Sequence, residues 1–228
     1  MKKIGIVGWK TGENSFGATL PYLNYLSKFG QVEIITPRKG IIEGLDLLVL
    51  PGGADLNPSV YGEVPGYYTS NPDIMKQFFY ENNLDQYVRN NTPIFGICLG
   101  FQQLSSYFGC KITQDMYHPT STKSRSDLVH SVVLCNGVEV TDDKTNPILL
   151  RSLLKGKEIR TKKVNSLHHQ AVHLSDFNHK DLLLTMIDED GEFVESWTHK
   201  ELPISGVQYH PEEFNDSYAS KIIKNFLT

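Results

Sequence analysis

The stretch PIFGICLG, residues 93–100, decides the fold of this chain. Its first five residues form a continuous apolar run, which is typical of a strand buried on both faces of a parallel sheet. A helix pattern begins directly afterwards at Leu99 and continues to Phe108. The two patterns place Cys98 in a sharp strand-to-helix turn, with Gly96 and Gly100 on either side.

A turn of this kind suits a nucleophile. It holds the central side chain in a strained, exposed position, and the flanking glycines let neighbouring backbone pass close by. The helix that follows directs its N-terminus at the sulfur, which favours thiolate over thiol. The pattern therefore makes Cys98 a candidate nucleophile, although a buried cysteine in a tight turn gives the same pentapeptide.

Strands and helices alternate outward from this stretch through the first half of the chain. The apolar patterns predict strands at 3–7, 32–35, 45–50 and 93–97, and helices at 20–29, 73–89 and 99–108. The second half is β-rich, with strands expected at 128–134, 182–187, 192–197 and 207–209. Turn signals stand at Asn136-Gly137 and Asp190-Gly191. A helix is expected in the last dozen residues. We therefore expect a single α/β domain over residues 1–228, with a mostly parallel, doubly wound sheet flanked by helices.

Composition and charge restrict the function classes. The 228 residues are 39% hydrophobic and carry a net charge of −4, so neither nucleic acid nor an acidic membrane surface is an expected partner. The apolar run after Lys2-Lys3 ends at Gly8, which is too short for an export signal or a membrane span. Three cysteines without a CxxC pair favour a reducing, cytoplasmic location and no zinc site.

Two further segments place chemistry at predicted strand ends. His210 follows an apolar strand and Glu212 comes two residues later, so the pair can supply a base and the carboxylate that orients it. Pro51-Gly52-Gly53 follows another strand, and its amides, with that of Leu99, suit an oxyanion hole. Taken alone, a surface histidine and an ordinary turn are the simpler explanations. Active sites of open α/β sheets lie at the carboxyl ends of strands, which brings both segments to Cys98.

These segments belong to a longer ordered set of motifs. The set comprises PGGADLNP at 51–58 with Tyr61, GICLGFQ at 96–102, Gln114-Asp115, VNSLHHQAV at 164–172, Asp190-Gly191 with Glu195, and GVQYHPE at 206–212. In this order they resemble the class I glutamine amidotransferases over nearly the whole chain. Within that superfamily they are most similar to the γ-glutamyl-amide hydrolases, the C26 peptidase-like branch that includes γ-glutamyl-γ-aminobutyrate hydrolase. The resemblance implies a flavodoxin-like fold with the cysteine turn at its centre.

The resemblance also implies a role for each matching position. Cys98 would attack the γ-carbonyl of a glutamine-like group, and His210, oriented by Glu212, would transfer the protons. A γ-glutamyl thioester would form, and water would release glutamate. The amides of Gly53 and Leu99 would hold the oxyanion. The implied substrate-binding positions are Gly52, Gln102, Ser166, Leu167 and His168. This chemistry requires no cofactor and no metal.

Leu99 departs from the pattern of the γ-glutamyl-γ-aminobutyrate hydrolases, which usually carry arginine directly after the nucleophile. Leucine at that position resembles the glutaminase domains that feed ammonia to a synthetase. The leading hypothesis is a stand-alone hydrolase acting on the γ-glutamyl amide of a small amine or metabolite. The alternative is a glutaminase subunit with a separate synthetase as its partner; the oligomeric state stays open. A third hypothesis, a regulatory protein without catalysis, is disfavoured because cysteine, histidine and glutamate are all present.

Smaller candidates have mostly structural interpretations. His168-His169 lacks a third residue at a metal-ligand spacing, and Cys110 and Cys135 are expected to be buried thiols. Residues 54–72 form a long predicted loop over the pocket. Its tyrosines either shape the leaving-group side of the pocket or pack on the surface; they are Tyr61, Tyr67 and Tyr68.

Overall fold

The computed structural model describes residues 1–13, 15–36, 40–116, 119–138, 160–178 and 180–228, with the backbone alone at 136–138. The strands of this part of the chain are β1 (Lys3–Val7), β2 (Trp9–Gly12), β3 (Ser15–Gly17), β4 (Gln31–Ile35), β5 (Leu47–Leu50), β6 (Ile94–Ile97), β7 (His130–Val138), β8 (Thr161–Val164), β9 (Val172–His173), β10 (Leu182–Asp188), β11 (Phe193–His199) and β12 (Ile204–Val207). The helices are α1 (Leu20–Leu26), α2 (Ile74–Asn82), α3 (Leu84–Arg89), α4 (Leu99–Tyr107) and α6 (Ser217–Phe226), with the short 3-10 helices η2 (Pro58–Tyr61), η4 (Leu174–Asp176) and η5 (Pro211–Glu213).

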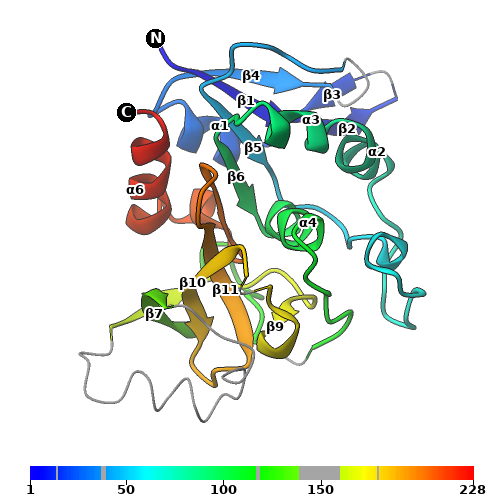
Figure 1. Cartoon of the computed structure of the whole chain (residues 1–228), viewed down its shortest axis with the longest axis vertical. Coiled ribbons are helices and arrows are strands. Elements are labelled where there is room, and N and C mark those ends of the chain that lie inside the picture. The colour runs from blue at the N-terminus through cyan, green and yellow to red at the C-terminus, as the bar shows by residue number, and fades with distance from the viewer. Residues whose placement is uncertain (14, 37–39, 117–118, 139–159, 179) are drawn as a thin grey trace.

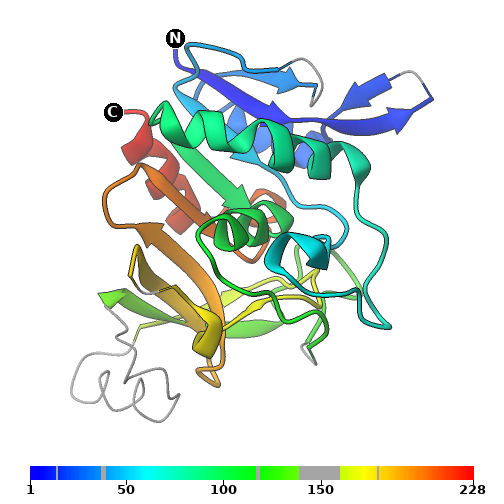
Figure 2. The ribbon, with the colours of Figure 1, turned by 45° about the vertical axis from the view of Figure 1, so that its right-hand side comes forward.

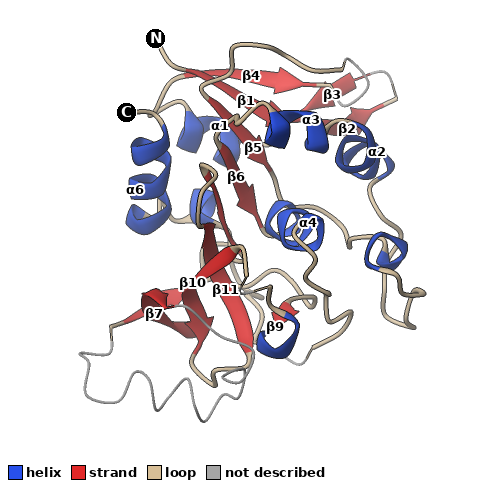
Figure 3. Ribbon diagram, viewed as in Figure 1, coloured by secondary structure: helices blue, strands red, loops and turns tan. Residues whose placement is uncertain are grey.

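One ten-stranded sheet runs through the described part of the chain (Figure 1). Its order is β4-β1-β5-β6-β12-β11-β10-β7-β8, with β9 paired to β11. The strands from β4 to β12 pair in parallel, and those from β12 to β8 pair antiparallel. Figure 3 shows the longer helices gathered around the parallel strands, while β7, β10 and β11 extend away from them. The predicted doubly wound sheet with a β-rich second half is therefore confirmed.

The inner parallel strands β5, β6 and β12 are buried on both faces, which explains their continuous apolar runs, whereas β4 at the edge is partly exposed. Because successive side chains of a strand point to opposite faces, Leu48 and Leu50 of β5 join the core under α2, α3 and α4. Leu47 and Val49 join the core under α1 and α6. Figure 2 shows the two groups of helices on opposite sides of the sheet. Among the described helices, none has the length and apolar character needed to cross a bilayer.

Several predicted elements differ from the observed ones. The helix predicted over 73–89 is interrupted at Asn83, which ends α2 and begins α3 with a φ of −121°. The turn predicted at Asn136-Gly137 is wrong, because β7 continues to Val138, where it pairs with Leu184 of β10. The last parallel strand is β12, which ends at Val207 rather than beginning there. The predicted hairpin at Asp190-Gly191 is confirmed by the antiparallel pairing of β10 and β11.

The hairpin of β2 and β3 has no counterpart in the sequence prediction. Its strands are short, and their side chains are exposed or only partly buried, so they show no alternation of apolar and polar residues. The hairpin brings Trp9 next to Tyr22 of α1, with 6.0 Å between their ring centroids. It thus adds a wall to the cavity described below.

Candidate active site

Cys98 occupies the strand-to-helix turn that the sequence predicts, but its side chain is buried rather than exposed, as α4 packs closely on the sheet. It has φ 52° and ψ −106°, a region that residues with a side chain rarely adopt, and it directly precedes α4. The flanking glycines are required by space. A Cβ on Gly96 would lie 2.7 Å from the carbonyl oxygen of Gly100, and a Cβ on Gly100 would overlap the carbonyl group of Leu50. The turn is therefore held by close packing of α4 on β5 and β6.

The sheet register brings the three predicted segments to one edge. Leu50 pairs with Gly96, and Gly96 pairs with Gly206. Each chain segment then leaves the sheet within a few residues, so Gly52, Cys98 and His210 follow at neighbouring strand ends. The convergence of these segments at the carboxyl edge, predicted from parallel pairing alone, is confirmed.

His210 is held from several directions. Its Nδ1 lies 2.7 Å from Oε1 of Glu212, and both side chains are buried. Its backbone N–H donates to Oδ1 of Asn165 at 2.9 Å, and its carbonyl oxygen accepts from Nδ2 of the same residue at 3.2 Å. This two-way clamp fixes the backbone, and the carboxylate fixes the ring. Nε2 is consequently the nitrogen left to face the cysteine side of the cavity.

Opposing effects act on the protonation of His210. Burial favours the neutral imidazole, but the negative charges of the Cys98 thiolate and of Glu212, with the hydrogen bond to Glu212, raise the pKa of His210 to about 10. A raised pKa favours the protonated imidazole, which can give a proton to a leaving amine. The negative charges beside His210 therefore outweigh the effect of its burial.

Two backbone amides at the site have no hydrogen-bond acceptor among the described residues. They are the N–H of Gly53, after β5, and the N–H of Leu99, the first residue of α4. The neighbouring amide of Gly52 donates to the hydroxyl of Tyr22 at 2.9 Å. That hydroxyl lies 3.4 Å from Nδ1 of His210. Burial and the charge of Glu212 raise the pKa of Tyr22 well above its ordinary value, so the phenol stays neutral.

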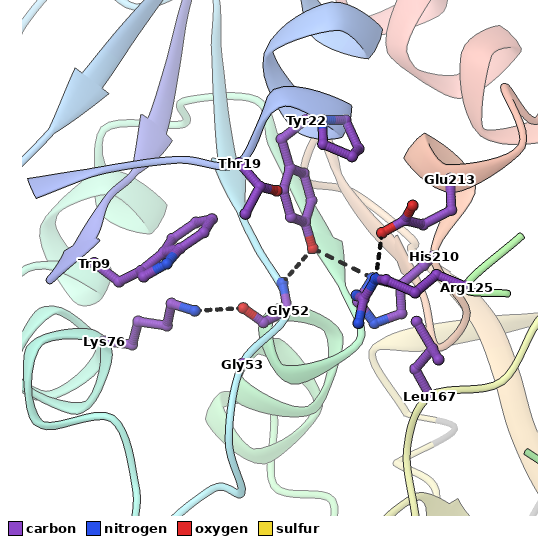
Figure 4. Close-up of a pocket in the computed structure, with 11 residues that line it drawn as sticks. Trp9, Thr19, Tyr22, Gly52, Gly53, Lys76, Arg125, Leu167, His210 and Glu213 are labelled. Atoms are coloured by element: carbon purple, nitrogen blue, oxygen red, sulfur yellow. Dashed lines mark hydrogen bonds and ion pairs between the residues drawn. The ribbon is translucent and has the colours of Figure 1, made fainter. Parts of the chain in front are cut away.

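A cavity of about 550 Å³ lies at this edge of the sheet (Figure 4). Cys98, Leu99 and Glu212 are not among its lining residues. Of the predicted site residues, Gly52, Gly53, Leu167 and His210 line it. The remaining lining residues are Trp9, Thr19, Pro21, Tyr22, Lys76, Arg125 and Glu213. Figure 4 shows Tyr22 above Gly52, with Trp9 and Lys76 to the left of Gly52 and His210 to its right. The cavity volume is in the range of small-molecule sites.

The other predicted substrate-binding residues lie beside the cavity without lining it. The amide of Gln102 donates to the carbonyl oxygen of Gln170 at 2.9 Å and to the side chain of Gln208 at 3.3 Å. His168 is buried, with its Nδ1 3.1 Å from the same carbonyl oxygen. Ser166 is bound through its backbone N–H to the hydroxyl of Ser121 at 3.1 Å. These contacts support the loop that carries Leu167 into the cavity.

The smaller candidates have structural surroundings. His169 bridges Asp55 and Asp115, each at 3.1 Å, and so joins the 54–72 loop to the segment after β8. No group of three or more His, Cys, Asp or Glu side chains within the described ranges could hold a metal ion. Tyr67 and Tyr68 are exposed and do not line the cavity, so these two belong to the surface. Cys110 and Cys135 are buried thiols as expected, and burial raises the pKa of each to about 12.

Besides most of the cavity-lining residues, three residues that bind Gly52 or His210 were not among the predicted site residues. Tyr22, Lys76 and Asn165 all contact Gly52 or His210. Asn165 stands within the VNSLHHQAV motif, so its position carried a signal. Tyr22 and Lys76 lie on helices with no local motif, and nothing in the sequence near them indicates that they reach the site.

The cysteine turn and its histidine stand within a segment that matches a known family. A family model described as Peptidase C26 matches residues 25–212, most of the chain. The chain belongs to the Peptidase C26 family. This C26 protein therefore lies in the class I glutamine amidotransferase superfamily, whose members hydrolyse amides through a cysteine.

Relatives of this C26 protein include glutamine amidotransferases and their subunits. Protein NtpR of Enterococcus hirae is 32% identical over 176 residues, covering 75% of this chain and 68% of NtpR. The glutamine amidotransferase-like protein YvdE of Lactococcus lactis is 27% identical, covering 84% and 78%. One subunit of the glutamine-hydrolysing GMP synthase of Pyrococcus furiosus is 26% identical, covering 80% and 85%.

Solved structures agree on the fold. The crystal structure of a protein described as a GMP synthase subunit, from Thermoplasma acidophilum, superposes with a TM-score of 0.64 at 22% identity, covering 100% of this chain and 92% of the other. A glutamine amidotransferase from Thermotoga maritima gives a TM-score of 0.53 at 15% identity, covering 100% and 86%. The class I glutamine amidotransferase fold is thereby established for this chain.

Proposed function

We propose that this protein hydrolyses a γ-glutamyl amide of a small amine or metabolite, with Cys98 as nucleophile, His210 as base and Glu212 as the orienting carboxylate. The observation that carries the proposal is the strained turn that holds the buried Cys98 at the same strand edge as His210, whose Nδ1 lies 2.7 Å from Oε1 of Glu212. A cysteine with a histidine base and an orienting carboxylate can perform this chemistry without a metal.

The groups around the cavity support each step. The thiolate attacks the γ-carbonyl carbon, and the negative charge that develops on the carbonyl oxygen is met by the free amides of Gly53 and Leu99. The carbon–nitrogen bond then breaks, the leaving amine takes the proton of His210, and a γ-glutamyl thioester remains on Cys98. Water attacks the thioester while His210 accepts its proton. The products are glutamate and the free thiolate beside a protonated imidazole.

The binding roles of the flanking residues are part of the same proposal. Leu167 lines the cavity next to His210, and its segment is fixed by His168, Ser166 and Gln102 through buried hydrogen bonds. These residues would hold the amino-acid end of the substrate through this loop rather than by side chains that line the cavity. The released amine would occupy the side lined by Trp9 and Pro21.

Glutamate release from glutamine and from a panel of γ-glutamyl amines tests the proposal, with Cys98→Ala as the control. Quenched reactions analysed by peptide mass spectrometry should show a γ-glutamyl group on the peptide that contains Cys98. Turnover of at least one γ-glutamyl amine by the isolated chain is the expected result. Failure to release glutamate from every substrate of the panel would reject a stand-alone hydrolase.

A glutaminase subunit is the second candidate. Leu99 favours it, and so do relatives named as parts of synthases, which include the GMP synthase subunit from Pyrococcus furiosus and an anthranilate synthase component 2 from Saccharolobus solfataricus. Such a subunit would hydrolyse glutamine but no other γ-glutamyl amide. It would do so only when a co-purifying synthetase is present. The same substrate panel, repeated with and without the partner, separates the two functions.

A further inference from the structure

Lys76 is buried beside the proposed oxyanion loop. It lies in the first turn of α2, and its side chain is only 5% exposed. Its Nζ donates a hydrogen bond to the carbonyl oxygen of Gly52 and lies 4.3 Å from the centroid of the Trp9 ring (Figure 4). Burying an ammonium group is unfavourable unless its partners compensate. The two contacts of the Lys76 ammonium group are therefore the place to look for its role.

The peptide group that Lys76 binds is the one that carries the proposed oxyanion donor. The carbonyl of Gly52 and the N–H of Gly53 belong to the same planar trans unit, so they point in opposite directions. Fixing the oxygen toward Lys76 therefore fixes the N–H away from it. The preceding N–H, that of Gly52, is held by Tyr22. Both peptide groups that flank Gly52 are thus anchored, one on each side.

This anchoring matters because the loop is made of glycines. A peptide between two glycines turns over easily, since neither residue has a side chain to restrict its dihedral angles. A turned peptide would present the carbonyl of Gly52 where the N–H of Gly53 is required, and a negative dipole would then face the developing oxyanion. Space also favours glycine at this point, since a Cβ on Gly53 would lie 2.7 Å from Nζ of Lys76 and 2.7 Å from Cδ2 of Leu99.

We propose that Lys76 is a positioning residue that keeps the Gly52–Gly53 peptide in the orientation that forms the oxyanion hole, so that the hole is complete in the isolated chain. This inference rests on the proposed function, because it assumes that the amide of Gly53 meets an oxyanion. The ammonium also polarises the peptide it binds, which makes the Gly53 N–H a stronger donor. Burial lowers the pKa of Lys76 to about 8, opposed by the charges of Asp73 and Cys98, so the cation is present at neutral pH.

The test compares Lys76→Met, which keeps the length of the side chain without its charge, with Lys76→Arg, which keeps a donor. Lys221→Met, on the exposed face of α6, is the matched control. We expect Lys76→Met to lower kcat about a hundredfold, the loss typical of one oxyanion donor. KM should stay within about threefold, since the affected contact forms only in the transition state. Lys76→Arg should recover most of the loss, and Lys221→Met should match the wild type.

A second measurement separates this role from direct stabilisation of the thiolate. Alkylation of Cys98 by iodoacetamide requires no oxyanion hole, so its pH midpoint should move by less than about half a unit in Lys76→Met. A midpoint raised by a full unit or more would assign Lys76 to the thiolate and overturn the inference. So would an unchanged kcat, or a loss confined to KM.

Crystal structures of the wild type and of Lys76→Met provide a readout independent of turnover. If the wild type releases no glutamate from any γ-glutamyl amide, the proposed function fails. The orientation of the Gly52–Gly53 peptide in the two crystal structures still tests the role of Lys76. A Gly52 carbonyl that turns toward Cys98 in Lys76→Met supports it. A carbonyl that keeps the wild-type direction overturns it.

Discussion

Gly52 offers a direct steric test of the site, because the absence of a side chain there makes room for His210. A Cβ at Gly52 would lie 2.5 Å from Cε1 of His210, 3.2 Å from its Nε2 and 3.0 Å from the hydroxyl of Tyr22. Ordinary contact to a Cβ begins at 3.4 Å. The substitution Gly52→Ala therefore requires the imidazole, the phenol or the loop to move by about 0.9 Å at the closest contact, in a site where a displacement of about 1 Å can reduce the rate about a hundredfold.

The expected loss in kcat for Gly52→Ala is thus about a hundredfold, or about 2.7 kcal/mol in activation free energy. The fold should be retained, as measured by circular dichroism. The assay is glutamate release from the best substrate of the panel, followed by coupled oxidation of glutamate. Gly17→Ala is the control, because its Cβ would meet only the exposed side chain of Thr11, at 3.2 Å, and that side chain can move. A folded Gly52→Ala protein with kcat within about threefold of the wild type would refute this account of the site.

Three further substitutions test other contacts. Cys98→Ala should keep the thermal midpoint of the wild type and abolish glutamate release; residual turnover near the wild-type rate would contradict its role as nucleophile. Glu212→Gln removes one of the charges that raise the pKa of His210, so the imidazole titration followed by NMR should move to lower pH, and kcat should fall by about 10²- to 10⁴-fold. An unchanged titration midpoint would mean that Glu212 does not control the base. Ser105→Ala removes the acceptor of the buried Trp197 indole N–H, 2.8 Å away, and should lower the free energy of unfolding in urea by about 1–3 kcal/mol without changing kcat. A loss below about half a kcal/mol would show that another group accepts this N–H.

The parts of the site that the sequence predicts are those built from neighbouring residues. The turn at Cys98, the glycines at 52–53 and the pair of His210 and Glu212 each follow an apolar run within a few residues. Parallel strands end at the same edge, so the pattern of strands alone brings these groups together. The strand at 3–7, the helix that starts at Leu99 and the hairpin at 190–191 were likewise correct, because each has a strong local period or turn signal.

The predictions that failed concern elements whose limits depend on distant partners. β7 continues through Asn136 to Val138, which pairs with β10 some fifty residues further along the chain, with a shift of register between Leu134 and Val138. This distant pairing outweighs a local turn signal. The helix over 73–89 is interrupted at Asn83, a residue type that favours helix ends over helix interiors. The β2–β3 hairpin lies largely exposed and carries no apolar period.

The sequence by itself determined the turn at Cys98, the position of His210 and Glu212 after a strand, and the strand edge at which these segments meet, because the order of short-range patterns encodes them. Only the tertiary structure decided which side chains support them. Tyr22 stands 188 residues from His210 in the chain, and Lys76 stands 24 residues from Gly52, yet both are bound to the site. Neither has a local pattern that could reveal this. Helix packing across the sheet selects such contacts, since it depends on the shape and charge of the whole core rather than on the period of any one segment.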